Sequence, residues 1–138
     1  MSGGSAVVEG LVAEGVTHAF GVIGTAMLEV FDALYERSDV AYVGVLHEQN
    51  AVHMADGYAR VRGRSGAVLA GQPGPGATNL VTGLAEARHA FSPVVVVAGD
   101  TASLQVDRDT FQEVDQQALF APVAQRTTTV VMQVHGRE

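Results

Sequence analysis

The sequence has no cysteine, few basic residues and no long apolar run, and each absence excludes a class of protein. Without cysteine, the 138-residue chain can form neither a disulfide nor a thiolate site. Its 8 Lys and Arg residues form no basic run and the formal net charge is −7, which argues against a nucleic-acid partner. The most apolar run, 94–98, is too short to cross a bilayer, and residues 1–5 lack the features of a secretory signal. We therefore expect a cytoplasmic protein with no nucleic-acid or membrane partner.

Several catalytic patterns are absent as well. The Gly/Pro turn at 71–76 is neither a dinucleotide-binding fingerprint nor a phosphate-binding Walker loop. The five histidines show no metal-ligand spacing, so no metal site is predicted. No serine or threonine stands in a nucleophile elbow, so a serine-hydrolase mechanism is not expected either.

The chain does contain enough apolar material for one core. Hydrophobic residues make up 47% of the chain and charged residues 17%, and no linker or repeat divides it. Because 138 residues fit one domain, we predict a single domain over 1–138, with a core of about 5–130 and a tail at 131–138.

Helical and strand-like segments alternate along the chain. Residues 27–34 carry apolar side chains at the spacing of one helical face, and further helices are predicted at 5–14, 48–62, 76–90 and 112–119. Short apolar runs predict strands at 40–46, 67–70 and 93–98, and the continuous run 94–97 is typical of a strand covered on both faces. The alternation predicts the α/β class, with a doubly wound parallel sheet and helices on both faces.

Three segments are expected at the carboxyl ends of the strands, where such sheets bind ligands: 21–25, 47–48 and 71–76. Glu48 is the strongest candidate for a functional residue, because it lies where a strand is expected to end and a helix to begin. Acidic residues are common in a first helical turn because they complement the helix dipole, so position alone favours that ordinary role. Asp56 and Glu86 are interpreted as solvated helix positions.

Together, these segments resemble the N-terminal, pyrimidine-binding domain of thiamine-diphosphate enzymes of the acetolactate synthase and 2-oxo acid decarboxylase type. The resemblance covers residues 6 to about 128, and its strings follow the family's order. The strings are AEGV (13–16), FGVIG (20–24), HEQNA (47–51), ADGYAR (55–60), GPGATN (74–79) and FQE (111–113). This ordered set overturns the ordinary interpretation of Glu48.

The resemblance implies a role for each matching residue. The glutamate matching Glu48 hydrogen-bonds N1′ of the aminopyrimidine ring and thereby activates the cofactor. The implied cofactor-binding residues are Gly24, Thr25, Glu48, Pro73 and Asn79, and the implied substrate-channel residues are Gln72, Phe111 and Gln112. The implied reaction is decarboxylation of a 2-oxo acid with transfer of the acyl unit, for which the cofactor supplies the electron sink.

The substrate and the function class are left open by particular residues. Thr25 stands where the family commonly has glycine, and Pro73 where it commonly has serine. Gln72 and the string FQEVDQ (111–116) are similar to sulfoacetaldehyde acetyltransferases, and a sulfopyruvate decarboxylase-like subunit is a further alternative. Two other classes are a non-catalytic assembly module of the same fold and a doubly wound domain that binds an unrelated nucleotide.

The sequence contains only half of the cofactor site that the family needs. Its members use a second domain, with a Gly-Asp-Gly motif and a downstream Asn, to hold Mg²⁺ and the diphosphate. The nearest string in this chain is Gly99-Asp100-Thr101. The resemblance therefore implies a shared site in which Mg²⁺ is bound only by a diphosphate-binding partner domain or subunit. We expect a homo- or hetero-oligomer and no catalysis by the isolated chain.

Overall fold

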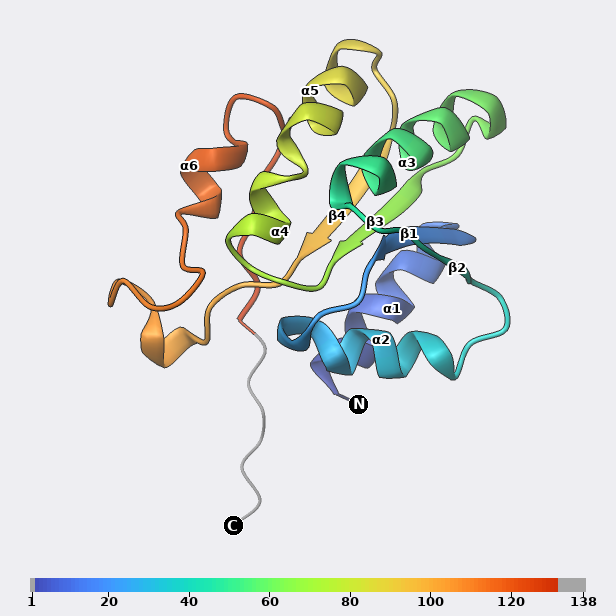
Figure 1. The fold of residues 1–138 in the computed structure, drawn as a ribbon. Coiled ribbons are helices and arrows are strands. Elements are labelled where there is room, and N and C mark those ends of the chain that lie inside the picture. Colours follow the sequence, from blue (N-terminus) through green and yellow to red (C-terminus); the bar gives the residue numbers. More distant parts are fainter. Residues whose placement is uncertain (1, 132–138) are drawn as a thin grey trace.

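Four parallel strands form one sheet in the order β2-β1-β3-β4 (Figure 1). The computed structural model describes residues 2–131. The strands are β1 (His18–Val22), β2 (Ala41–Gly44), β3 (Gly66–Ala70) and β4 (Val94–Ala98). A strand before the turn at 21–25 is expected, but the sequence predicts no bounds for β1, because its residues, HAFGV, contain no β-branched run.

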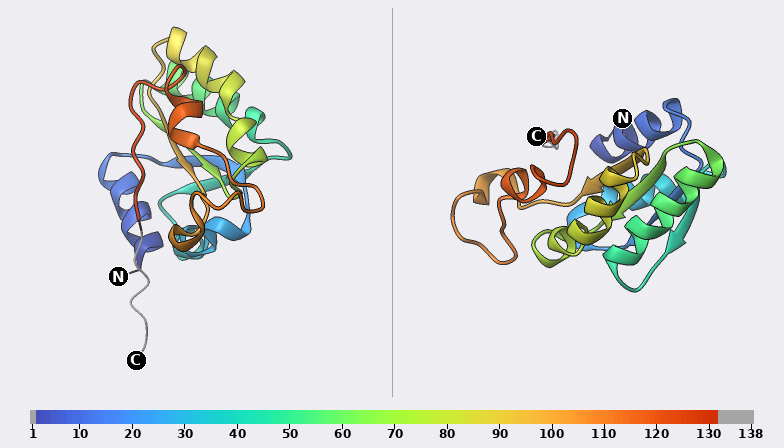
Figure 2. Two further views of the ribbon diagram at one scale, coloured as in Figure 1. Left: turned by 90° about the vertical axis from the view of Figure 1, so that its left-hand side faces the viewer. Right: turned by 90° about the horizontal axis from the view of Figure 1, so that it is seen from above.

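Helices cover both faces of the sheet, which confirms the predicted doubly wound α/β fold (Figures 1 and 2). One face carries α1 (Gly3–Ala13), the short helix η1 (Thr25–Met27) and α2 (Leu28–Tyr35). The other carries α3 (Glu48–Arg62), α4 (Pro75–Thr78) and α5 (Val81–His89), with η2 (Ser103–Gln105) and α6 (Gln116–Phe120) in the segment after β4. No helix within residues 2–131 has both the length and the hydropathy needed to span a membrane.

The two faces bury separate hydrophobic clusters, and β3 contributes to both. Ala67 and Leu69 of β3 belong to the cluster under α1 and α2, whereas Val68 and Ala70 belong to the cluster under α3 and α5. The alternation of side chains along a strand explains this division. All five residues of β3 are buried, because the strand lies between two neighbours and under helices on both faces.

Helix α3 lies close to the sheet because its buried face is made of small residues. Ala51, Ala55 and Ala59 are each at most 2% exposed. Gly66 of β3 lies directly beneath, where an added Cβ would be 3.1 Å from Ala55. Close seating of α3 matters for the site, since Glu48 is the first residue of this helix.

Strand β4 corrects one prediction, because it is not fully covered on both faces, and it is also an edge strand of the sheet. Its only neighbour among the described residues is β3, and Val95 is 39% exposed. The fully buried strand is β3, whose residues are the small and apolar GAVLA. A β-branched run therefore indicates strand structure here, but position within the sheet is set by the order in which the strands pair.

Two predicted helices have other bounds in the structure than the sequence predicted. The predicted helix 76–90 is two helices, α4 and α5, because the chain tightens between them, where the Leu80 N–H donates to the Ala77 carbonyl at 3.1 Å. The predicted helix 112–119 begins only at Gln116, since Gln112 has a left-handed φ of 64°. Strand β2 covers 41–44 of the predicted 40–46. Of the predicted tail, 132–138 lies outside the described residues.

Asp56 is buried rather than solvated, which corrects another prediction, whereas Glu86 is exposed as expected. Asp56 is 5% exposed, and both its carboxylate oxygens accept hydrogen bonds from Arg60, at 2.9 and 2.7 Å. These bonds hold the pKa of Asp56 below its ordinary value of 3.8, although burial opposes the shift. Arg60 also bonds Glu86 of α5 at 3.1 Å, so the network joins α3 to α5.

We predict that Asp56→Asn lowers the free energy of unfolding by about 1.5–3 kcal/mol at neutral pH, because a charged hydrogen-bond pair is lost at a buried position. A depressed pKa in the folded state means that this contribution is present above the ordinary carboxyl pKa and is lost as pH falls through the lowered value. The difference between wild type and variant should therefore shrink below about pH 4. Urea unfolding at pH 7 and at pH 3.5 measures it. The exposed partner offers a control, since Glu86→Gln should cost less than about 1 kcal/mol.

Candidate functional site

The direction in which successive strands are added to the sheet reverses between β1 and β3. The chain leaves β1 toward β2 on one side, and leaves β3 toward β4 on the other (Figure 1). Ligands of doubly wound sheets bind beyond the carboxyl ends of the strands at such a reversal. The turns that follow β1 and β3 are those predicted from the sequence, 21–25 and 71–76.

The two turns touch through a pair of glycines. An added Cβ on Gly71 would be 2.1 Å from the nitrogen of Gly24, and one on Gly24 would be 2.5 Å from the carbonyl of Gly71. Gly71 donates its N–H to the Val22 carbonyl at 3.0 Å and accepts from the Ala26 N–H at 3.1 Å. Glycine is required at both positions because only a backbone without side chains allows this approach.

Side chains continue the contact between the turns. The Gln72 amide donates to the Thr25 hydroxyl at 3.2 Å, so the two residues predicted for the channel and the cofactor face each other. Pro73 is buried beside them. Gly74 then adopts a φ of 54° before α4 begins at Pro75, a conformation that favours glycine. This turn therefore presents Gln72 toward β1 and directs α4 toward α3.

Glu48 lies at the same carboxyl edge, following β2 at the first position of α3. His47 caps the helix, and its Nδ1 accepts a hydrogen bond from the Gln49 N–H at 3.2 Å. The Glu48 side chain is directed inward, and the residue is only 8% exposed. Asn79 donates its amide N–H to Oε2 of Glu48 at 2.9 Å. The two residues, 31 positions apart, thus form one polar pair where α3 meets α4.

The two carboxylate oxygens of Glu48 differ in their hydrogen-bond partners. Oε1 accepts no hydrogen bond from residues 2–131, whereas Asn79 holds Oε2. An added Cβ on Gly76 would be 3.4 Å from Oε1 and 3.2 Å from Cβ of Gln72, so the glycine connects Glu48 to the turn after β3. A buried carboxylate with one anchored and one free oxygen can accept a hydrogen bond from a ligand N–H, or take up a proton and return it.

The remaining predicted residues lie in the segment after β4. The backbone of Gln112 packs against the turn after β3, since an added Cβ on Gly74 would be 2.6 Å from the Gln112 carbonyl oxygen. Phe111 is 88% exposed, so its ring is not part of the packed surface around Glu48. Gly71 and Gly76 are not among the predicted site residues, although the Gly/Pro turn 71–76 that contains them is predicted at this edge of the sheet.

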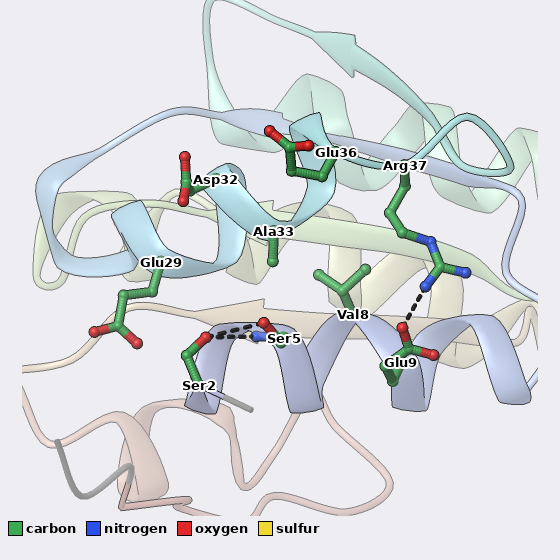
Figure 3. A pocket seen from close by; sticks show the side chains of 9 residues that line it. All are labelled: Ser2, Ser5, Val8, Glu9, Glu29, Asp32, Ala33, Glu36 and Arg37. Carbon is green, nitrogen blue, oxygen red and sulfur yellow. Dashed lines mark hydrogen bonds and ion pairs between the residues drawn. The ribbon is translucent and has the colours of Figure 1, made fainter. Parts of the chain in front are cut away.

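A hollow lies between α1 and α2, and Figure 3 shows its lining. Arg37 forms an ion pair with Glu9 across it, while Glu29, Asp32 and Glu36 line the α2 side. None of its lining residues surrounds Glu48, so this hollow is separate from the candidate site. Among the described residues, no three His, Cys, Asp or Glu side chains are grouped so as to hold a metal ion.

Comparison with known families identifies a match over most of the chain. The model for "Thiamine pyrophosphate enzyme, N-terminal TPP binding domain" matches residues 1–119. A probable acetolactate synthase large subunit of Methanocaldococcus jannaschii is 46% identical over 123 residues, which are 89% of this chain and 20% of that protein.

Other relatives carry two different names. Acetolactate synthase isozyme 3 large subunit of Escherichia coli is 43% identical over 130 residues, covering 94% of this chain and 22% of that protein. A sulfoacetaldehyde acetyltransferase of Alcaligenes xylosoxydans xylosoxydans is 45% identical over 120 residues, covering 87% of this chain and 20% of that protein. The chain thus spans about a fifth of the length of the curated relatives it matches.

Proposed function

This chain belongs to the thiamine pyrophosphate enzyme family, as its N-terminal TPP-binding domain, and we propose that it binds the aminopyrimidine part of thiamine diphosphate with Glu48 as the activating carboxylate. The observation that carries the proposal is the buried carboxylate of Glu48, with Oε2 anchored by Asn79 and Oε1 free beside Gly76. When bound, thiamine diphosphate supplies the electron sink for decarboxylation and acyl transfer.

The residues of this chain fit that group. Oε1 of Glu48 would share a proton with a ring nitrogen of the pyrimidine, and burial of the carboxylate would limit competition by water for that oxygen. Asn79 prevents rotation of the carboxylate, because it holds the opposite oxygen. Gly76 leaves the space beside Oε1 free of side-chain atoms, and Gly24, packed on Gly71, holds Thr25 against Gln72 in the adjoining turns, where Pro73 is buried.

We further propose that the site is shared with a diphosphate-binding domain or subunit that carries Mg²⁺. The relatives' length supports a second domain, since this chain corresponds to about a fifth of them. Most of the charge of the cofactor is on its diphosphate, which Mg²⁺ binds through oxygen ligands. Assembly into a homo- or hetero-oligomer then places Glu48 opposite the diphosphate site.

For the reaction, we propose acetolactate synthase-like decarboxylation of a 2-oxo acid with transfer of the acyl unit. A sulfoacetaldehyde acetyltransferase-like reaction is the second candidate. It is supported by a relative of that name at 45% identity, against 46% for an acetolactate synthase relative, and by Gln72 in the turn after β3. In both cases the same carboxylate activates the cofactor, so the two candidates differ only in the acids and acceptors that the site admits.

Calorimetry tests the shared site. We expect the isolated chain, titrated with thiamine diphosphate in the presence of Mg²⁺, to bind weakly or not at all and to release no CO₂ from pyruvate. The remaining contacts, one carboxylate hydrogen bond and apolar packing, must offset the cost of immobilising the ligand. Tight binding should appear once a diphosphate-binding domain is added. Micromolar affinity of the chain alone would show that the diphosphate binds on this chain and would refute the shared site.

A further inference from the structure

Three residues of the segment 107–113, which precedes α6, adopt the left-handed backbone conformation that residues other than glycine rarely adopt. Asp107, Asp109 and Gln112 have φ values of 63°, 52° and 64°. Side chains other than glycine are strained in this left-handed region, and such residues persist only where surrounding contacts hold them. Hydrophobic burial does not supply those contacts, because residues 102–109 and Phe111 are exposed.

The Glu113 carboxylate supplies them instead. Oε1 accepts from the Asp107 N–H at 2.6 Å, and Oε2 accepts from the Thr110 N–H at 2.8 Å and from the Thr110 hydroxyl at 3.3 Å. These bonds, led by the one from the Thr110 N–H, lower the pKa of Glu113, so it is ionised at neutral pH. One charged side chain thus closes residues 107–113 into a ring.

The ring reaches the candidate site through the residue before Glu113. Gln112 lies against Gly74, where an added Cβ would be 2.6 Å from the Gln112 carbonyl oxygen and 3.0 Å from its Cα. On the other side, the Gln116 amide donates to the Gly99 carbonyl at 2.8 Å, at the carboxyl end of β4. The ring is therefore seated against the turn that follows β3.

We propose that Glu113 is a positioning residue that holds Gln112 beside the turn at Gly74, and that it thereby sets the affinity for the substrate rather than the rate of cofactor activation. The inference rests on the proposed function, which places the reacting groups at this edge. Its physical basis is preorganisation: the loop is already ordered before a ligand arrives, so binding does not incur the cost of ordering it.

The first test measures the loop itself in the 138-residue chain by amide hydrogen exchange. Glu113→Gln keeps the size of the side chain but offers one oxygen to two N–H groups. We expect exchange at Asp107 and Thr110 to accelerate about tenfold or more. Exchange at Val68, in the middle of β3, should not change. The matched control is Asp109→Asn, which removes the same charge from the same loop at another left-handed residue. Wild-type exchange in Glu113→Gln would overturn the proposal.

The second test measures the consequence in the enzyme assembled with a diphosphate-binding domain, with pyruvate as the probe. We expect Glu113→Gln to raise KM about tenfold with little change in kcat, and C2–H exchange of bound thiamine diphosphate to stay at the wild-type rate. A fall in kcat at unchanged KM would refute the positioning role. An assembled wild type without thiamine-diphosphate-dependent turnover would instead refute the proposed function, while the amide exchange result would still show whether Glu113 organises the loop.

Discussion

Replacing Glu48 by Gln should slow C2–H exchange of bound thiamine diphosphate by about 10²–10⁴-fold, because the variant removes a positioned acid–base group. This range corresponds to roughly 3–5 kcal/mol of barrier at about 1.36 kcal/mol per decade. The amide has the size of the carboxylate and can still accept from Asn79 through its oxygen, so fold and partner binding should be nearly unchanged. The measurement is NMR after acid quench of the enzyme assembled with a diphosphate-binding domain.

A matched control separates this role from simple complementation of a helix dipole. Glu29 occupies the first turn of α2, as Glu48 does in α3, but it is exposed. Glu29→Gln should leave the exchange rate unchanged and cost less than about 1 kcal/mol of stability. If the Glu48 variant exchanged at the wild-type rate, Glu48 would have no part in activation, and the ordinary dipole interpretation would be restored.

Replacing Gly71 by Ala should destabilise the fold by about 3 kcal/mol, at the upper end of the usual cost of overpacking. The added methyl group meets the nitrogen and Cα of Gly24 and the carbonyl carbon of Ile23, at 2.1, 2.7 and 2.8 Å. Backbone atoms cannot rotate away as side chains can, so the two turns must separate. Separation also strains the hydrogen bonds that Gly71 forms with Val22 and Ala26. Urea unfolding measures the loss.

Gly57 provides the comparison for that substitution. It lies within α3, and an added Cβ there meets no atom within 4 Å. Gly57→Ala should therefore stabilise the protein by about 0.5–1 kcal/mol, since alanine loses less backbone entropy in a helix. Equal effects of the two substitutions would mean that the contact between the turns does not constrain the fold.

Local chemistry made much of the fold predictable. The apolar periodicity of 27–34 and 48–62 depends on neighbours three and four residues apart, and both segments are helical over most of their length. The Gly/Pro turn at 71–76 follows a strand, as expected. The predictions failed where distant partners decide. Asp56 looks like a solvated residue, but it is buried in a network that Arg60 extends to Glu86 of α5; 94–97 looks covered on both faces, but Val95 is 39% exposed in the folded sheet.

By itself, the sequence determined the alternation of helices and strands and the positions of Glu48 and of both glycine-rich turns, and the resemblance to a known family gave these residues their expected roles. Only the tertiary structure decided what these residues touch. It joined Asn79 to Glu48 across 31 positions, brought Gly24 against Gly71, and seated Gln112 on Gly74. The physical reason is that helix and turn formation depend on interactions between near neighbours. Contacts between turns arise only when parallel strands, whose pairing spans tens of residues, bring their carboxyl ends to one edge.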